Sequence, residues 1–176
     1  PSSLGTGDWK AAAFLNASAN GGGASINLYS NSDKEWIISP VFDLTTGSPL
    51  ELVISAGVTN YNSSAADVMG SDDEVLVLIS EDNMATWTTL YTWNASNQPP
   101  NTGSTYNISL AGYNTNNNII AIYATDGTVD DSEDYDFHIG NFEIRTVPNC
   151  LAPTALSLSA INSGSAVLAW TENNTS

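Results

Sequence analysis

The chain has 176 residues, of which 19 are Asp or Glu and only 3 are Lys or Arg, so its formal net charge is −16. Nucleic-acid binding requires cations that neutralise phosphates, and an anionic membrane surface repels an acidic protein, so the composition argues against both partners. No apolar run approaches the roughly 20 residues that span a bilayer, which argues against membrane insertion. The length is sufficient for one domain with a good core plus a tail.

Cysteine and histidine chemistry is scarce, since Cys150 and His138 are the only residues of their types. A disulfide within the chain is impossible, and whether Cys150 is free or pairs outside this sequence stays open. A zinc site of the usual Cys/His type is nearly excluded as well. The chain opens at Pro1 without a signal peptide, which we interpret as the start of an excised fragment.

The predicted elements, in chain order, are all β-strands. They are short, rich in Val, Ile, Tyr and Trp, and separated by clusters of Gly, Asn, Ser and Asp. The expected strands are residues 24–30, 35–44, 50–59, 74–80, 86–93, 105–110, 119–125 and 136–146. Only residues 9–15 show a brief helical period. The pattern predicts an all-β protein, a two-sheet antiparallel β-sandwich of the jelly-roll type.

Three strands carry further information. Residues 75–79 and 119–123 are apolar on both faces, so we expect them at the centre of a sheet, covered on both sides. In the last strand, Phe137 and Ile139 are odd-numbered, whereas Phe142 and Ile144 are even-numbered. Strict alternation cannot produce this change, so we predict a β-bulge at residues 140–141.

The domain organisation follows from the Pro-containing segment at residues 148–153, which is typical of a linker. Residues 1–147 then form the sandwich. Residues 154–176 contain two strand-like segments but are too few to close a core, so we interpret them as the truncated start of a second module.

A dense acidic run extends from Asp126 to Asp136 and leads directly into the last strand. Such a run is either a solvated loop or a set of oxygen ligands for a hard cation. Ca²⁺ prefers six to eight oxygens, and the run lacks the EF-hand spacing, so its ligands would come from separate loops. The candidate metal ligands are Asp130, Asp131, Asp134 and Asp136, with Asp72 and Asp73 from across the fold.

Several segments, in order, resemble the MAM-like "choice-of-anchor" (cleaved adhesin) jelly-roll domains of secreted bacteroidete-type proteins. The resemblance lies in Trp36-Ile-Ile-Ser-Pro-Val-Phe-Asp-Leu44, in residues 73–80 followed by Thr86-Trp87, and in residues 134–144. It implies a non-catalytic, often calcium-stabilised module for adhesion or glycan binding. Gly140 stands where the family usually has Asp, which leaves Asp134 and Asp136 as the better metal ligands. Residues 150–170 resemble the start of a fibronectin type III domain.

Catalysis has weak support in the sequence. Residues 80–87 approximate the Asp-box S-x-D-x-G-x-T-W, with Met84 in place of Gly, and this hairpin is structural in enzymes and non-enzymes alike. No Ser or Cys has a nucleophile signature, although sequence alone cannot exclude a pair of glycosidase carboxylates. We therefore predict that the chain is not an enzyme.

The aromatic residues are divided between core and surface. Trp36, Trp87 and Trp170 lie within or beside predicted strands and are expected in the core. Sugars bind to flat aromatic faces flanked by hydrogen-bonding groups. The candidate sugar-binding aromatics, near predicted loops or strand ends, are Tyr61, Tyr91, Trp93 and Tyr113.

Two functions from different classes follow. The first is a calcium-stabilised adhesion or scaffolding module of a large secreted or cell-surface bacterial protein, whose partners are a glycan or an extracellular protein and the neighbouring domains. The alternative is a carbohydrate-binding module attached to a polysaccharide-degrading enzyme. Both place the chain outside the cell.

Overall fold

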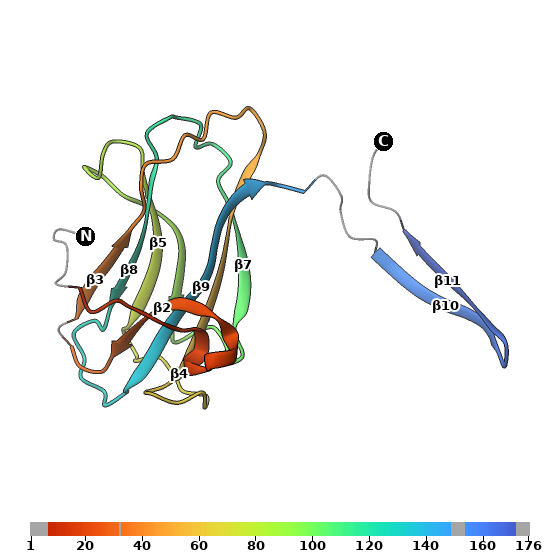
Figure 1. The fold of residues 1–176 in the computed structure, drawn as a ribbon, viewed down its shortest axis with the longest axis horizontal. Helices are drawn as coiled ribbons and strands as arrows, with labels where there is room; N and C mark the ends of the chain where they lie inside the picture. The colour runs from red at the N-terminus through yellow and green to blue at the C-terminus, as the bar shows by residue number, and fades with distance from the viewer. Residues whose placement is uncertain (1–6, 32, 149–153, 172–176) are drawn as a thin grey trace. The chain divides into compact units, whose positions relative to one another are not determined.

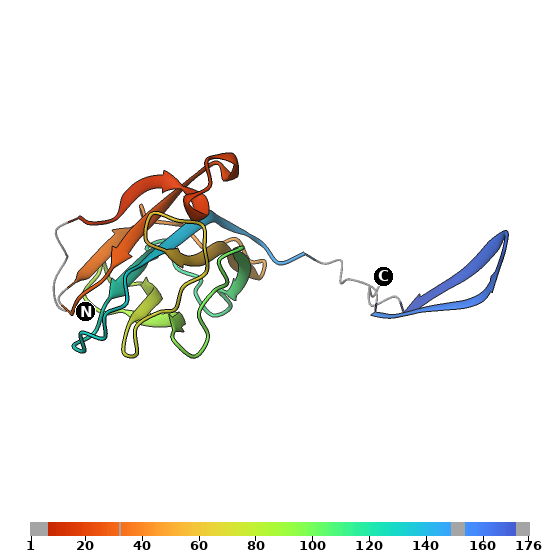
Figure 2. The same cartoon turned by 90° about the horizontal axis from the view of Figure 1, so that it is seen from below.

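The computed structural model describes residues 7–31, 33–148 and 154–171. Contacts divide the chain into two units, Pro1–Arg145 and Thr146–Ser176. The first unit is a sandwich of two antiparallel sheets, seen as two layers in Figures 1 and 2, and this confirms the predicted fold class.

Each of the two sheets combines strands from distant parts of the chain. Sheet A has the order β1 (Lys10–Ala13), β2 (Gly22–Leu28), β9 (Tyr135–Thr146), β4 (Leu50–Asn60) and β7 (Ser104–Ser109). Sheet B has the order β3 (Lys34–Ile38), β8 (Ile119–Thr125), β5 (Glu74–Ser80) and β6 (Thr88–Asn94). β5 and β8, the two strands apolar on both faces, are central in sheet B as predicted.

The core lies between the inner faces of the two sheets. Alternate residues of β4 and β8, such as Ile54 and Ile122, point into it, and the largest fully buried side chains there are Trp93, Tyr135 and Phe137. Trp93 and Phe137, from opposite sheets, have ring centroids 5.4 Å apart. Each of these aromatics buries more apolar surface than any aliphatic side chain of the core, so each contributes a large share of its stabilisation.

The outer face of sheet A is closed by a short strap that the sequence does not predict. The strand β1 leads into the 3₁₀ turn η1 (Phe14–Asn16), which η2 (Ser18–Asn20) follows, where the sequence shows only a brief helical period. Leu15 is buried although its φ is 61°, and a Cβ at Gly57 would lie 2.1 Å from its Cδ2. Glycine in β4 therefore leaves the space that Leu15 fills, which offsets the cost of a left-handed leucine.

The strand β9 changes face where the sequence predicts it. Phe137 and Ile139 belong to the core, Ile144 also packs against it, and Phe142 stacks on Phe42 at 6.4 Å. The β2–β9 ladder keeps one register and ends at the Ala24–Ile139 pair, directly before Gly140. The change of face therefore falls just beyond this ladder, and the bulge itself stays a prediction.

The predicted strand 35–44 ends early, at Ile38. Pro40 has no N–H to donate to a ladder, and Ser39 Oγ accepts a hydrogen bond from the backbone N–H of Ile120 (2.9 Å). Beyond Ile38, the isolated bridge between Phe42 and Asn118 continues the pairing.

The second unit contains the hairpin β10 (Thr154–Asn162) and β11 (Ser165–Thr171). Its Trp170 is 55% exposed, so the prediction that this tryptophan is a core residue is wrong within the described residues. An isolated two-stranded hairpin buries too little apolar surface to form a core. Most of the predicted linker, including Cys150, lies outside the described residues. The described residues contain no helix long and apolar enough to span a membrane.

Candidate glycan-binding face

The register of sheet B places a row of large side chains on its outer face. Trp36 of β3 pairs with Tyr123 of β8, which pairs with Leu76 of β5, which pairs with Thr92 of β6. Directly paired residues share a face. Their neighbours Ile37, Ile122 and Val75 belong to or pack against the core, so this row faces away from it.

Three aromatic rings gather on this face. The centroid of Trp36 lies 4.6 Å from that of Tyr123 and 5.5 Å from that of Trp87, at interplanar angles of 47° and 41°. These are contact distances for aromatic pairs. We call Trp36, Trp87 and Tyr123 the ring cluster. All three are only partly buried, and no strand of the two described sheets lies over this face.

Trp87 reaches the cluster from the hairpin between β5 and β6, the segment that approximates an Asp-box. Asp82 accepts hydrogen bonds from the Thr86 hydroxyl (2.6 Å), the Thr86 N–H (2.9 Å) and the Ser80 hydroxyl (2.8 Å). These donors, those of Thr86 foremost, lower the pKa of Asp82 to about 2. The hydrogen bonds from Thr86 to Asp82 thus close the hairpin directly before Trp87, and this fixes where the indole leaves the backbone.

The same face explains how two apolar strands remain central without a third layer. Leu78 and Ala121 pair with each other on this face and are almost fully buried. Ile38 pairs with Ala121 and completes an apolar row beside the rings. The expected cover on both sides is therefore sheet A on one side and bulky side chains on the other.

Polar groups flank the rings on the opposite side. Two residues along each strand, Lys34, Thr125, Glu74 and Asn94 form a second row on the same face, which we call the polar row. Two strand residues span about 7 Å, so the polar row lies roughly that far from the ring row. Rings bordered by hydroxyl, amide and charged groups form the kind of surface to which sugars bind.

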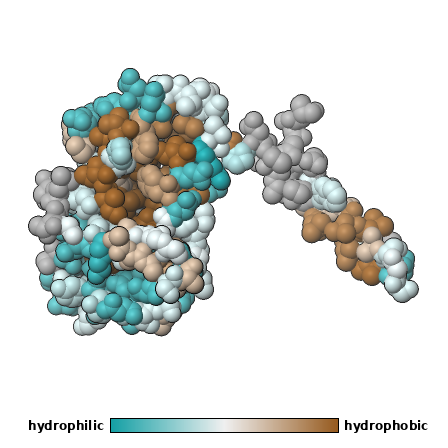
Figure 3. Space-filling model, in the orientation of Figure 1, coloured by the Kyte–Doolittle hydropathy of each residue, from teal (hydrophilic) through white to brown (hydrophobic). Residues whose placement is uncertain are grey.

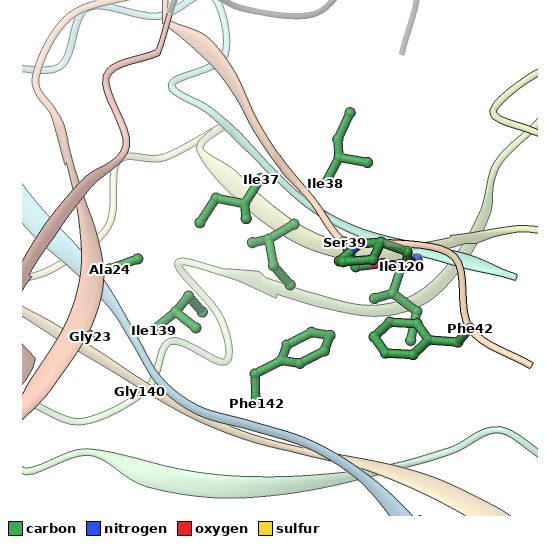
Figure 4. Close-up of a pocket in the computed structure, with 12 residues that line it drawn as sticks. Gly23, Ala24, Ile37, Ile38, Ser39, Phe42, Ile120, Ile139, Gly140 and Phe142 are labelled. Carbon is green, nitrogen blue, oxygen red and sulfur yellow. Dashed lines mark hydrogen bonds between the residues drawn. The ribbon is translucent and has the colours of Figure 1, made fainter.

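A hollow opens between the two sheets, where β3 faces β2 and β9 (Figure 3, Figure 4). It has a volume of about 390 Å³ and is lined by isoleucines of both sheets, with Phe42 and Phe142 at one end. Its only side-chain hydroxyl, that of Ser39, is bonded to backbone groups at Pro40 and Ile120. A sugar would find few hydrogen-bond partners there, so the hollow suits apolar groups rather than glycans.

The four predicted sugar-binding aromatics do not form one surface. Trp93 is fully buried in the core, so its prediction as a binding residue is wrong. Tyr91 is half-buried against Trp93 at 5.1 Å. Tyr113 lines a separate cavity of about 310 Å³ with Leu44 and Pro49. Tyr61 is 44% exposed at the end of β4.

The acidic run Asp126–Asp136 and the loop that carries Asp72 do meet, but through backbone donors. Asp72 accepts hydrogen bonds from the N–H of Thr128 (2.8 Å) and of Val129 (3.3 Å). In return Asp131 accepts one from the N–H of Ser71 (2.6 Å). The bond with Glu133, together with the donors of Ser71, lowers the pKa of Asp131 to about 2. Each loop thus supplies a carboxylate that accepts hydrogen bonds from backbone N–H groups of the other loop.

The remaining predicted metal ligands are scattered. Asp73 accepts from the buried Tyr135 hydroxyl (2.6 Å), and Asp134 accepts from Asn27 (2.8 Å). Asp136 lies beneath the η1 strap, where Asn16 (2.8 Å) and the N–H of Asn62 (2.9 Å) donate to it. Asp130 is exposed.

The fit of these residues to calcium is therefore poor. Within residues 7–31, 33–148 and 154–171, no group of three or more His, Cys, Asp or Glu side chains is arranged to hold a metal ion.

Burial raises the pKa of Asp33, and the neighbouring charges of Asp126, Asp8 and Glu35 raise it further. That repulsion marks a second acidic region, which the sequence analysis did not select.

His138 is buried beneath the same strap as Asp136. Its Nε2 lies 2.9 Å from the Thr59 hydroxyl, and the edge of Phe14 contacts its ring at 6.3 Å. Burial lowers the pKa of its imidazole. This is a packed histidine of sheet A, and it lies away from both the hollow and the ring cluster.

Comparison with known proteins gives likenesses of fold only. No protein-family model matches the sequence, and no curated protein matches it. Solved structures that resemble it include Family 16 Carbohydrate Binding Module-2 (11% identity, TM-score 0.46, 78% of this chain and 85% of that one). TmCBM61 in complex with β-1,4-galactotriose has 10% identity and a TM-score of 0.46, over 80% and 83% of the two chains. CBM27-1 of Caldicellulosiruptor saccharolyticus in complex with mannohexaose has 11% identity and a TM-score of 0.49, over 80% and 84%.

Proposed function

We propose that this chain is a non-catalytic carbohydrate-binding module and that the ring cluster is its sugar platform. The observation that carries the proposal is the gathering of Trp36, Trp87 and Tyr123 on the outer face of sheet B. Half-buried aromatic rings are costly to leave in water, and stacking against the CH groups of a sugar recovers that cost. Adhesion through a glycan would use the same surface.

Two observations, on the hollow between the sheets and on the buried carboxylates, support a non-catalytic role. The hollow between the sheets is lined by no Asp, Glu, His or Cys side chain. The buried carboxylates Asp73, Asp126 and Asp136 each accept hydrogen bonds from groups within the fold. Glycoside hydrolysis needs two carboxyl groups that face one sugar, one as acid and the other as base or nucleophile.

The experiment is a glycan array with purified protein. Trp36→Ala and Trp87→Ala should each weaken binding about tenfold or more, because central aromatic anchors dominate binding energy. Tyr61→Ala, which removes an exposed ring elsewhere, should bind as the wild type does. Thermal melts of each variant separate lost binding from lost folding. Wild-type protein that binds no glycan, or folded tryptophan variants that still bind, would refute the proposal.

Four further predictions of the sequence stand beside this proposal. We retain an extracellular location, membership of the MAM-like family, and fibronectin type III character for residues 154–176. A structural calcium ion also remains a prediction, to which no ligand set is assigned.

A further inference from the structure

The geometry of the ring cluster restricts what it can bind. Its rings are in contact, with centroids 4.6 and 5.5 Å apart, so they form one compact patch and not a spaced row along a strand. Their planes are inclined to one another by 47° and 41°. Trp36 therefore cannot lie flat against the same planar surface as either of the other two rings.

We infer that the ring cluster recognises a short stretch of a neutral, soluble glycan chain, and neither a crystalline polysaccharide surface nor a polyanionic glycan. This inference rests on the proposed function and specifies its ligand class. A crystal face of cellulose or chitin presents many sugars in one plane and needs coplanar rings to match it. Rings that are inclined to one another instead contact different faces of one or two sugars. Such faces are presented where a glycosidic linkage changes the direction of the glycan chain.

The polar row supplies the hydrogen bonds that such a sugar requires. Thr125, Glu74 and Asn94 lie on the same face, roughly 7 Å from the ring row, within reach of the hydroxyls of a sugar seated on the rings. The apolar row of Ile38, Ala121 and Leu78 bounds the cluster on its other side. The footprint is therefore narrow, with apolar contact at its centre and polar contact along one border.

Charge excludes acidic sugars. The chain has a net charge of −16, and of its three cations Arg145 is already paired with Glu51 at 2.8 Å. Lys34 lies in the polar row, but Glu74 lies in the same row and offsets its charge. A polyuronate or sulfated chain would meet long-range repulsion that Lys34 alone cannot overcome.

The test uses the glycan selected by the array as a ladder of soluble oligosaccharides, measured by isothermal titration calorimetry. Affinity should increase up to the trisaccharide and then change by less than about twofold up to the hexasaccharide. Washed microcrystalline cellulose and crystalline chitin should not deplete the protein from solution. Polygalacturonate should not bind at low ionic strength, where electrostatic interactions are least screened.

The opposite results would overturn the inference. These are affinity that keeps rising to the hexasaccharide, depletion by a crystalline polymer that Trp36→Ala abolishes, and polygalacturonate binding that is stronger at low salt. Each leaves the proposed function intact, because a glycan is still bound through the cluster. Failure of the proposed function looks different: no glycan of any kind binds, or binding survives in folded Trp36→Ala and Trp87→Ala proteins.

Discussion

The Asp73–Tyr135 pair gives the sharpest test of how this fold accommodates its acidic charge. Asp73 is 4% exposed, and one of its oxygens, Oδ2, accepts both the Tyr135 hydroxyl (2.6 Å) and the Gly70 N–H (3.2 Å). Burial raises the pKa of Asp73, although these two hydrogen bonds partly oppose the rise. The net effect is a pKa above the ordinary value of 3.8, so folding favours the neutral form of this side chain relative to the unfolded chain. Asp73→Asn supplies a neutral side chain that keeps an acceptor at the same place.

The expected effect depends on pH in a definite direction. The folded pKa of Asp73 is raised above 3.8, so the folded state holds its proton more tightly than the unfolded state does. The corresponding stability is present below about pH 3.8 and is lost as pH rises through the folded pKa. At pH 7 the free energy of unfolding of the Asn variant should therefore equal or exceed that of the wild type, by about 1.4 kcal/mol for each tenfold change that folding makes in the acid dissociation constant of Asp73. Near pH 3.5 the difference should vanish.

Tyr135→Phe makes the complementary change. It leaves a buried carboxylate without its strongest donor, at a cost of about 1.5–3 kcal/mol at pH 7. In the Asp73→Asn background the same substitution should cost less, because a neutral acceptor loses less than a charged one. Urea unfolding followed by tryptophan fluorescence measures these differences, since Trp93 is fully buried beside Phe137 in the core.

The reasoning would be refuted by an Asn variant that is clearly less stable at pH 7 and still less stable near pH 3.5. Loss at pH 7 alone, together with loss of any calcium-dependent stabilisation, would instead identify Asp73 as a cation ligand.

Three other substitutions test separate parts of the fold. Gly23→Ala would place a Cβ 2.6 Å from the carbonyl oxygen of Ile139 and should cost about 1–3 kcal/mol, whereas Gly22→Ala, which meets nothing within 4 Å, should be nearly neutral by the same urea assay. His138 has a pKa lowered from 6.5 by burial, so it contributes stability that is lost as pH falls below 6.5; His138→Gln should flatten the stability profile between pH 7 and pH 5. Met84 has a φ of 70°, so Met84→Gly should raise the free energy of unfolding by up to about 1 kcal/mol.

The strands could be predicted from the sequence because alternation and turn residues mark them directly. All eight predicted strands exist, with ends that differ by a few residues. One strand of the sandwich is not predicted from the sequence. It is β1, the run Lys10–Ala13, where three alanines give no alternating pattern. The strap after it depends on Leu15 fitting against Gly57, 42 residues along the chain, and local patterns do not report such a contact.

The assignment of the aromatics failed for a reason of register. Trp93 pairs with the core residue Val75 and so points inward, whereas Trp36 pairs with Tyr123 on the outer face. The ladder between β5 and β6 shifts register between Val77 and Leu78 because one residue of β6 is skipped, and this changes the face of the β6 residues that precede Tyr91. The segment around Trp36 is apolar at 36, 37 and 38 alike, so alternation there does not identify the outward residue. The sequence did contain one relevant signal. The strand β8 is apolar on both faces, so large side chains had to cover its outer face as well as its inner one.

The remaining question about the acidic run is whether its charge requires a bound cation. Carboxylates of the two facing loops are already bonded to backbone N–H groups, Asp72 to Thr128 and Asp131 to Ser71. For Asp131, hydrogen bonds lower the pKa and so favour the ionised form, as a bound cation would, although they leave the net charge unchanged. Repulsion among the charges is then relieved by ordinary salt, which screens without binding.

Calcium and screening can be separated in one melting experiment. The calcium prediction requires that calcium chloride raise the melting temperature above that in sodium chloride at equal ionic strength, and that EDTA reverse the rise. Binding to the folded state alone stabilises by about 2.7 kcal/mol when calcium is at 100 times its dissociation constant, which is a shift of several degrees for a domain of this size. Equal melting temperatures in the two salts would refute the calcium prediction. The stability would then rest on the N–H donors of the two loops and on screening, with no bound ion required.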